Sequence, residues 1–244
     1  INLAGSLKGR KAQKHAVSDW MQIEKERGIS VTSSVMQFEY DDMCINILDT
    51  PGYFDFVGEV EEAISVADAA IIVVNCKAGI EVGTEKAWEL CEEYNLPRLF
   101  FVTNMDDDQA SFRELILKLE KQFGRKIAPF QVPIRENEKF VGFVNVVKMK
   151  GRRFINDTSE YEECDIPDYM DKHLNISRDA LVEAVADTSE ELMERYFAGE
   201  EFTYEEVSTA LRTHVMDCQI VPVLVGSGIH NQGTSMLMNV IKKY

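Results

Sequence analysis

The feature that most constrains this chain is a regular alternation of short apolar runs with segments of helical period. The runs at 69–75, 99–103 and 219–225 are continuous and apolar, which is typical of strands covered on both faces. Residues 84–94 and 112–123 carry apolar side chains at helical spacing after the first two runs. This order predicts an α/β fold, with a mostly parallel sheet flanked by helices.

Two further segments complete the predicted core. Residues 31–40 and 43–48 are expected to form an antiparallel hairpin that turns at Asp41-Asp42. A last helix is predicted near 234–243.

Residues 127–217 interrupt the alternation and predict an inserted α+β lobe. Its expected members are two strand-like runs, an acidic loop and two helices, at 128–134, 140–150, 156–168, 177–196 and 203–217. We therefore expect a core formed by 1–126 with 218–244, and an inserted subdomain at 127–217.

Composition narrows the class of protein. The net charge of −16 argues against broad, nonspecific nucleic-acid binding, which needs clustered Lys and Arg. A modest basic cluster at 8–15 is interpreted as a solvated segment, with a narrow basic patch as the alternative.

No apolar run approaches the roughly 20 residues of a membrane span, so no membrane partner is expected. The five cysteines are an odd number without a C-x-x-C pair, which favours reduced, mostly buried thiols in a cytoplasmic protein.

Asp49-Thr50-Pro51-Gly52 follows the second hairpin strand directly. A carboxylate at the end of a strand can hold Mg²⁺ through water, and a glycine lets a backbone N–H approach a phosphate without a Cβ in the way. The motif therefore suggests a metal–phosphate site at Asp49 and Gly52. A plain turn is the alternative.

The run at 99–103 ends in Thr103-Asn104-Met105-Asp106. The Asp106 carboxylate can accept hydrogen bonds from N1–H and the 2-amino group of guanine, a pair of donors that adenine lacks. Gly226-Ser227-Gly228 follows the last buried run, where a backbone N–H can meet guanine O6. A simple turn is the alternative for Ser227 and Gly228, and their position as the third motif in order favours base binding.

Upstream, Ser30 follows Gly28 just before the hairpin. A hydroxyl in this position can ligate Mg²⁺ when bound nucleotide orders the loop. A charged helix capped by Gly28 is the structural alternative.

In this order and spacing, DWMQIEKERGIS, DTPG, TNMD and GSGIHNQG resemble switch I, switch II and the two base-recognition motifs of translational GTPases. The inserted lobe is similar to the extra subdomain of elongation factor G, and residues 9–38 look like peptide-chain release factor three. The resemblance implies a Ras-like P-loop NTPase fold, GTP or GDP with Mg²⁺, and action on the ribosome. It also implies that the lobe contacts the ribosomal stalk protein.

The chain departs from the family pattern at four points. The P-loop motif G-x-x-x-x-G-K-[ST] does not occur in the 244 residues, although the resemblance places its strand between those ending at Asp49 and starting at 69. Ser30 stands where elongation factors have Thr, and Asn104 stands in place of Lys. Tyr53 occupies the place of the His that positions the attacking water.

Two functional hypotheses follow from these matches and departures. The first is a ribosome-associated factor that couples GTP hydrolysis to a conformational switch, with Gly52 and Tyr53 as its catalytic residues. The second is a degenerate relative that acts as an interaction module with weak or no nucleotide binding. The 244 residues by themselves are not expected to hydrolyse GTP efficiently, because the P-loop supplies the main phosphate cradle.

Overall fold

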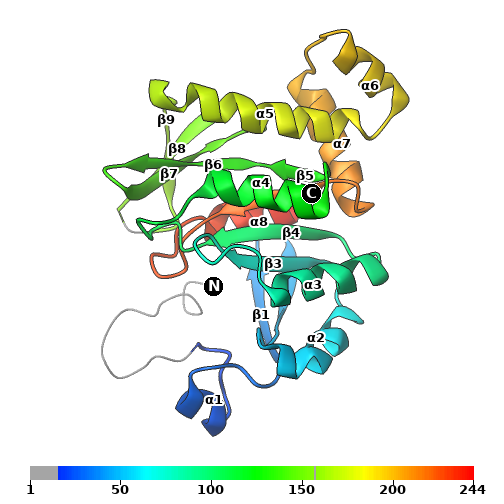
Figure 1. The fold of residues 1–244 in the computed structure, drawn as a ribbon. Helices are drawn as coiled ribbons and strands as arrows, with labels where there is room; N and C mark the ends of the chain where they lie inside the picture. Colours follow the sequence, from blue (N-terminus) through cyan, green and yellow to red (C-terminus); the bar gives the residue numbers. More distant parts are fainter. Residues whose placement is uncertain (1–15, 157) are drawn as a thin grey trace.

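The main sheet of the computed structural model, which describes residues 16–156 and 158–244, contains four parallel strands (Figure 1). In spatial order they are β3 (Ala70–Asn75), β4 (Arg98–Thr103), β10 (Val221–Val225) and β5 (Ile127–Pro129). Asn75 pairs with Thr103, and Val225 pairs with Val102. The carboxyl ends of three strands therefore meet at one edge of the sheet.

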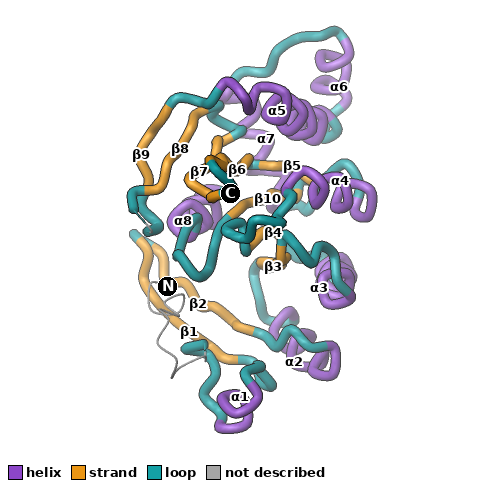
Figure 2. The backbone as a smooth tube through the Cα atoms, turned by 60° about the vertical axis from the view of Figure 1, so that its left-hand side comes forward, coloured by secondary structure: helices purple, strands orange, loops and turns teal. Residues whose placement is uncertain are grey.

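Helices cover both faces of this sheet. Figure 2 shows α3 (Val82–Glu93) and α4 (Phe112–Phe123) on one side, and α8 (Thr234–Lys243) on the other. The predicted α/β architecture is confirmed, and every apolar residue of β4 and β10 is buried. Strand β3 differs from the prediction, because its Ile71 and Val73 side chains are 39% and 61% exposed. Only one face of β3 is covered by the described residues.

The predicted hairpin forms a separate two-stranded sheet of β1 (Ser34–Tyr40) and β2 (Met43–Asp49). The Lys242 ammonium near the end of α8 lies 2.9 Å from the Asp41 carboxylate at the hairpin turn. Because α8 begins beside the carboxyl edge of the main sheet, this contact places the turn near the opposite edge. The other end of β2, at Asp49, consequently points back toward the carboxyl edge.

Residues 127–217 contain a second sheet and several helices. Strands β6 (Gln131–Glu136), β7 (Lys139–Asn145), β8 (Lys150–Phe154) and β9 (Tyr161–Cys164) form an antiparallel sheet in that order. The helices are η2 (Asp168–Met170), α5 (Asp171–Ala186), α6 (Glu190–Phe197) and α7 (Tyr204–Met216). Strand β5 pairs with β10 in the main sheet and so joins the two sheets. The division into a core and a subdomain at 127–217 stays a prediction.

Three expectations within this region were wrong in detail. The run at 140–150 is not one strand, because β7 ends at Asn145 and β8 begins at Lys150. The acidic loop at 156–168 contains β9, which pairs with β8. The helix expected at 177–196 is two helices, because the Ser189 hydroxyl accepts a hydrogen bond from Leu192 N at 3.2 Å and starts α6 anew.

The amino-terminal described segment contains α1 (Gln22–Arg27), and η1 (Phe54–Phe56) and α2 (Val57–Ile64) follow the hairpin. Figure 1 places α1 and α6 at opposite ends of the molecule.

The five cysteines are free thiols, as predicted, but only Cys76 and Cys91 are buried. Burial raises the pKa of both thiols to about 11, so they are protonated at neutral pH. Cys44 is exposed, contrary to the expectation of burial.

No helix in the described part of the chain is long and apolar enough to cross a membrane. The basic cluster at 8–15 lies outside the described residues.

The outer edge of β3 has no strand partner among residues 16–156 and 158–244. An unpaired edge beside exposed Ile71 and Val73 is a template for association, so we expect the purified 244-residue chain to self-associate. Light scattering should show that Val73→Lys is more monomeric than the unmodified chain, because a charged side chain disfavours edge-to-edge pairing of strands. Val66→Lys lies outside the sheet and should self-associate as much as the unmodified chain. A monodisperse monomer of the parent chain would contradict this expectation.

Candidate nucleotide-binding site

The loop after β4 holds a carboxylate oxygen that is buried and unsatisfied. Asn104 adopts a left-handed φ of 59°, and the fully buried Met105 donates its N–H to Gly226 O at 3.2 Å. The next residue, Asp106, has its Oδ1 atom buried, with no hydrogen-bond partner among the described residues. An acceptor that has lost water without gaining a donor is costly, so this oxygen fits a ligand that carries N–H groups.

The loop after β10 lies directly beside this carboxylate loop. Ser227 is fully buried, its N–H donates to Gln232 O at 3.0 Å, and Gln232 N–H donates back to Ser227 O at 2.9 Å. A Cβ placed on Gly228 would lie 3.9 Å from Thr103 Oγ1. The structure therefore brings Thr103, Asp106, Ser227 and Gly228 to one place, although they come from loops about 120 residues apart in the sequence.

The loop after β2 reaches the same edge of the sheet. The Gly52 carbonyl lies 3.4 Å from the position of a Cβ on Gly83, in the first turn of α3. A Cβ on Gly52 itself would meet nothing within 4 Å, and its φ is not left-handed. The fold therefore does not require a glycine at position 52, whereas close approach of a phosphate would. Tyr53 follows as the N-cap of η1, with its side chain 55% exposed.

The Ser30 hydroxyl is held by another side chain of the same segment. It donates a hydrogen bond to Asp19 Oδ1 at 2.8 Å, and Asp19 Oδ2 accepts from Ala16 N at 3.2 Å. Gly28 has a φ of 67° and caps α1 by donating its N–H to Glu24 O at 2.7 Å, so the structural alternative for Gly28 is confirmed. The hydroxyl oxygen keeps its lone pairs while it donates to Asp19, so this contact orients Ser30 and leaves its oxygen able to ligate a metal.

A buried glutamate fastens this segment to the start of the hairpin. Glu24 is fully buried, and its carboxylate accepts from Met21 N at 2.8 Å, Val31 N at 3.0 Å and Thr32 N at 3.2 Å. Burial raises its pKa, but the backbone hydrogen bonds outweigh that effect and leave the pKa below its usual value. Strand β1 starts at Ser34 rather than at 31 because these amides bind Glu24. Sequence spacing carries no signal for the roles of Asp19 and Glu24.

The two candidate Mg²⁺ ligands are not brought into contact. Ser34, four residues after Ser30, pairs with Asp49 across the hairpin, so both candidates lie at the same end of it. The described residues contain no cluster of three His, Cys, Asp or Glu side chains that could hold a metal. Hydroxyl and carboxylate oxygens are nevertheless the donor types that Mg²⁺ prefers, and it commonly completes its shell with phosphate and water.

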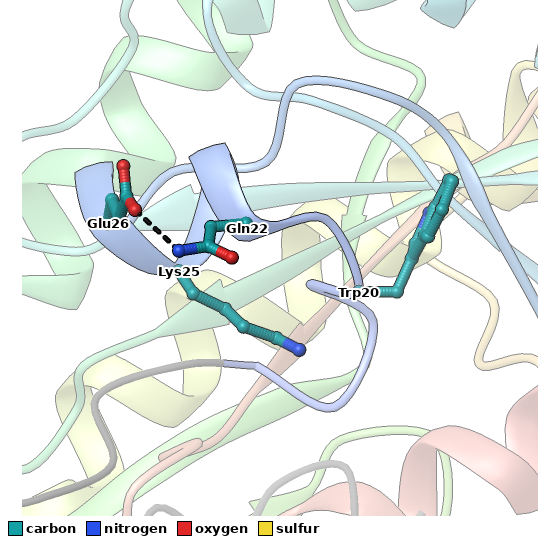
Figure 3. Close-up of a pocket in the computed structure, with 4 residues that line it drawn as sticks. All are labelled: Trp20, Gln22, Lys25 and Glu26. Carbon is teal, nitrogen blue, oxygen red and sulfur yellow. Dashed lines mark hydrogen bonds between the residues drawn. The ribbon is translucent and has the colours of Figure 1, made fainter.

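A shallow pocket of about 380 Å³ lies elsewhere, against α1 (Figure 3). Trp20, Gln22, Lys25 and Glu26 line it, and Gln22 Nε2 donates to Glu26 Oε1 at 2.8 Å. In Figure 3 the Trp20 ring points away from the three polar side chains. None of the candidate site residues lines this pocket. The pocket is therefore separate from the three loops at the sheet edge.

Comparison with known proteins identifies the family of this chain. Residues 2–244 match the family described as "Elongation factor Tu GTP binding domain". A crystal structure from Thermus thermophilus is similar, with a TM-score of 0.84 and 32% sequence identity. The match covers 93% of this chain and 34% of the Thermus chain, so the present chain spans about a third of that protein. The fold is accordingly Ras-like, and the chain belongs to the elongation factor Tu GTP-binding domain family of translational GTPases.

Proposed function

We propose that this chain is the nucleotide-binding part of a ribosome-associated, cytoplasmic translation factor that couples GTP hydrolysis to a conformational switch. The observation that carries the proposal is the buried, unpaired Oδ1 atom of Asp106 beside the Ser227 loop. Guanine offers the adjacent N1–H and 2-amino donors that such a carboxylate needs, whereas adenine does not. Family membership supports the same assignment.

Each candidate residue has a distinct role in this proposal. Thr103, Asn104 and Asp106 contact the base and its surroundings. The turn of Ser227 and Gly228 offers the Gly228 N–H to guanine O6, since the Ser227 N–H already donates to Gln232 O. Gly52 offers its amide to the terminal phosphate, and Tyr53 positions the attacking water. Ser30 and Asp49 hold Mg²⁺ directly or through water. When bound, the metal supplies positive charge that stabilises the phosphate oxygens during hydrolysis.

The test is a competition experiment on the full-length protein. A fluorescent GDP analogue should be displaced by GTP and GDP but not by ATP, and ribosomes should accelerate phosphate release from GTP. Guanine-selective binding without ribosome-stimulated hydrolysis would favour the alternative, a GTPase-like interaction module. That alternative is motivated by Tyr53 and Asn104, which replace the usual His and Lys. Binding without preference between GTP and ATP would remove both the base-site assignment and the proposed function.

The lobe helices are the proposed contact for the ribosomal stalk protein. Phe197 is the last residue of α6 and is 80% exposed. Figure 1 shows helix α6 at the far end of the lobe. The other exposed residues of this helix are Glu190, Glu191 and Glu194. An exposed aromatic side chain among them suits a protein partner better than packing against the core. Phe130, by contrast, is fully buried and donates its N–H to Val223 O of β10 at 3.0 Å, so removing the whole lobe would damage the core sheet.

We therefore expect Phe197→Ala to reduce ribosome-stimulated GTP turnover several-fold while leaving GDP affinity unchanged, because a typical interface anchor contributes about 1–2 kcal/mol. Val66→Ala, which truncates an exposed valine next to α2, is the matched control and should behave like the parent. Steady-state phosphate release with purified ribosomes measures the effect. Equal turnover of all three proteins would argue that the lobe is only structural.

A further inference from the structure

Arg135 connects the second sheet to the loop that carries Asp106. Its Nη1 atom donates to Met105 O and Ala110 O, each at 3.2 Å. Its Nη2 atom donates to Asp107 O at 2.9 Å and to Glu138 O at 2.5 Å. One guanidinium group in β6 thus binds three carbonyls of the loop between β4 and α4, on both sides of Asp106.

An irregularity in the backbone of β6 directs the Arg135 side chain toward this loop. The pairing between β6 and β7 shifts register between Ile134 and Arg135, and such irregularities redirect a side chain out of the regular alternation. Tyr169 Oη donates to Arg135 O at 3.0 Å. The neighbouring Glu136 carboxylate binds the Arg153 guanidinium through two hydrogen bonds, of 3.1 and 2.5 Å. The strand is therefore fixed at the point where Arg135 leaves it.

The loop's own hydrogen bonds are short-range: the Asp107 N–H donates to Asn104 O at 3.1 Å and the Ala110 N–H donates to Asp107 O at 3.2 Å. Lys77 Nζ lies 3.4 Å from Asp107 Oδ2, but both side chains are substantially exposed, and such pairs contribute little. Asn104 occupies the position where the resembling motif has a lysine, and its short side chain offers no long stem to pack along the loop. A guanidinium suits the task, since its planar fork of donors can bind several carbonyls at once, whereas an ammonium is a single point charge.

We propose that Arg135 is a positioning residue for guanine recognition: it holds the 105–110 loop in the conformation that keeps Asp106 aimed at the base. The inference rests on the proposed function, because it assigns Arg135 a role through Asp106. It also makes the second sheet part of the nucleotide site, since any displacement of β6 is transmitted to the base-reading loop.

The test uses Arg135→Ala and Arg135→Lys in the full-length protein. Arg152→Ala is the matched control, because Arg152 lies in the same sheet but its guanidinium pairs with Glu163 of β9 at 2.7 Å rather than with the 105–110 loop or with Glu136. The first readout is amide hydrogen exchange across 104–110 without nucleotide, which should be faster in Arg135→Ala than in the parent and the control. The second is the ratio of GDP to IDP affinity, since IDP lacks the 2-amino group that Asp106 would bind.

We expect Arg135→Ala to lose about tenfold in GDP affinity and distinctly less in IDP affinity, so the GDP preference falls. Arg135→Lys should be intermediate, and it carries the test if the alanine variant does not fold. General destabilisation would weaken GDP and IDP equally and leave their ratio unchanged. Parent-like exchange and a parent-like ratio in the variants would overturn the inference alone. A parent protein that binds GDP no better than ADP would overturn the proposed function, and the inference with it.

Discussion

Replacing Asp106 by Asn is expected to change the preferred nucleotide from GTP to XTP. The Asp106 carboxylate accepts from two guanine donors in the proposed site, and its Oδ1 atom is buried without another partner among the described residues. An amide at this position presents a donor to the 2-amino group of guanine, but it matches the 2-oxo group of xanthine. The mismatch should weaken GTP binding by roughly 2–4 kcal/mol, or about 30- to 1,000-fold.

Calorimetric titration of the full-length protein with GTP and XTP measures this change. Asp108→Asn is the matched control, because Asp108 is an exposed aspartate of the same loop and should keep the parent affinities. Unchanged GTP affinity in Asp106→Asn would remove Asp106 from the site.

Replacing Tyr53 by His is expected to raise ribosome-stimulated GTP turnover by about ten- to a hundredfold, equivalent to roughly 1.4–2.7 kcal/mol of activation barrier. Tyr53 follows Gly52, whose amide is proposed to meet the terminal phosphate. Phosphoryl transfer has a largely dissociative transition state, so the residue here acts by positioning and electrostatics. A neutral phenol can orient water but, unlike a protonated imidazole, supplies no positive charge.

Single-turnover hydrolysis on ribosomes distinguishes a catalytic role of the Tyr53 side chain from a purely structural one. Tyr53→Phe should slow the reaction if the hydroxyl holds water, and Phe54→His tests whether any imidazole at this exposed turn has the same effect. The Tyr53 side chain is 55% exposed, so packing alone does not account for a tyrosine at this position. Identical rates for Tyr, His and Phe at position 53 would show that the side chain is not catalytic.

Several parts of the fold were predictable from the sequence because their cause is local. The apolar runs of β4 and β10 have no polar interruption, and only strands covered on both faces bury such runs completely. The helical spacing of apolar residues predicts α3 and α4, because it marks the face of each helix that packs against the sheet. The order of the motifs around Asp49, Asp106 and Ser227 was likewise readable, since each directly follows a strand.

Other features depend on partners that no local pattern reveals. Strand β1 starts late because the amides of Val31 and Thr32 bind the buried Glu24 carboxylate. The Ser30 hydroxyl donates to Asp19, eleven residues away, so the orientation of its oxygen is set by a contact that the sequence pattern does not reveal. Ile71 and Val73 belong to an apolar run that predicts coverage on both faces, yet the described residues cover only one.

The sequence by itself determined the strand and helix types of the core, the chemistry of the three loop motifs and the family to which they belong. Hydrophobic periodicity indicates which side chains are buried. Short motifs indicate the backbone and side-chain chemistry at consecutive positions. Only the tertiary structure decided that Asp106 Oδ1 is buried without a partner among the described residues and that Arg135 binds the loop around it. Those facts arise from hydrogen bonds and burial between segments about thirty to a hundred and twenty residues apart, which the chain acquires only when its sheets have packed together.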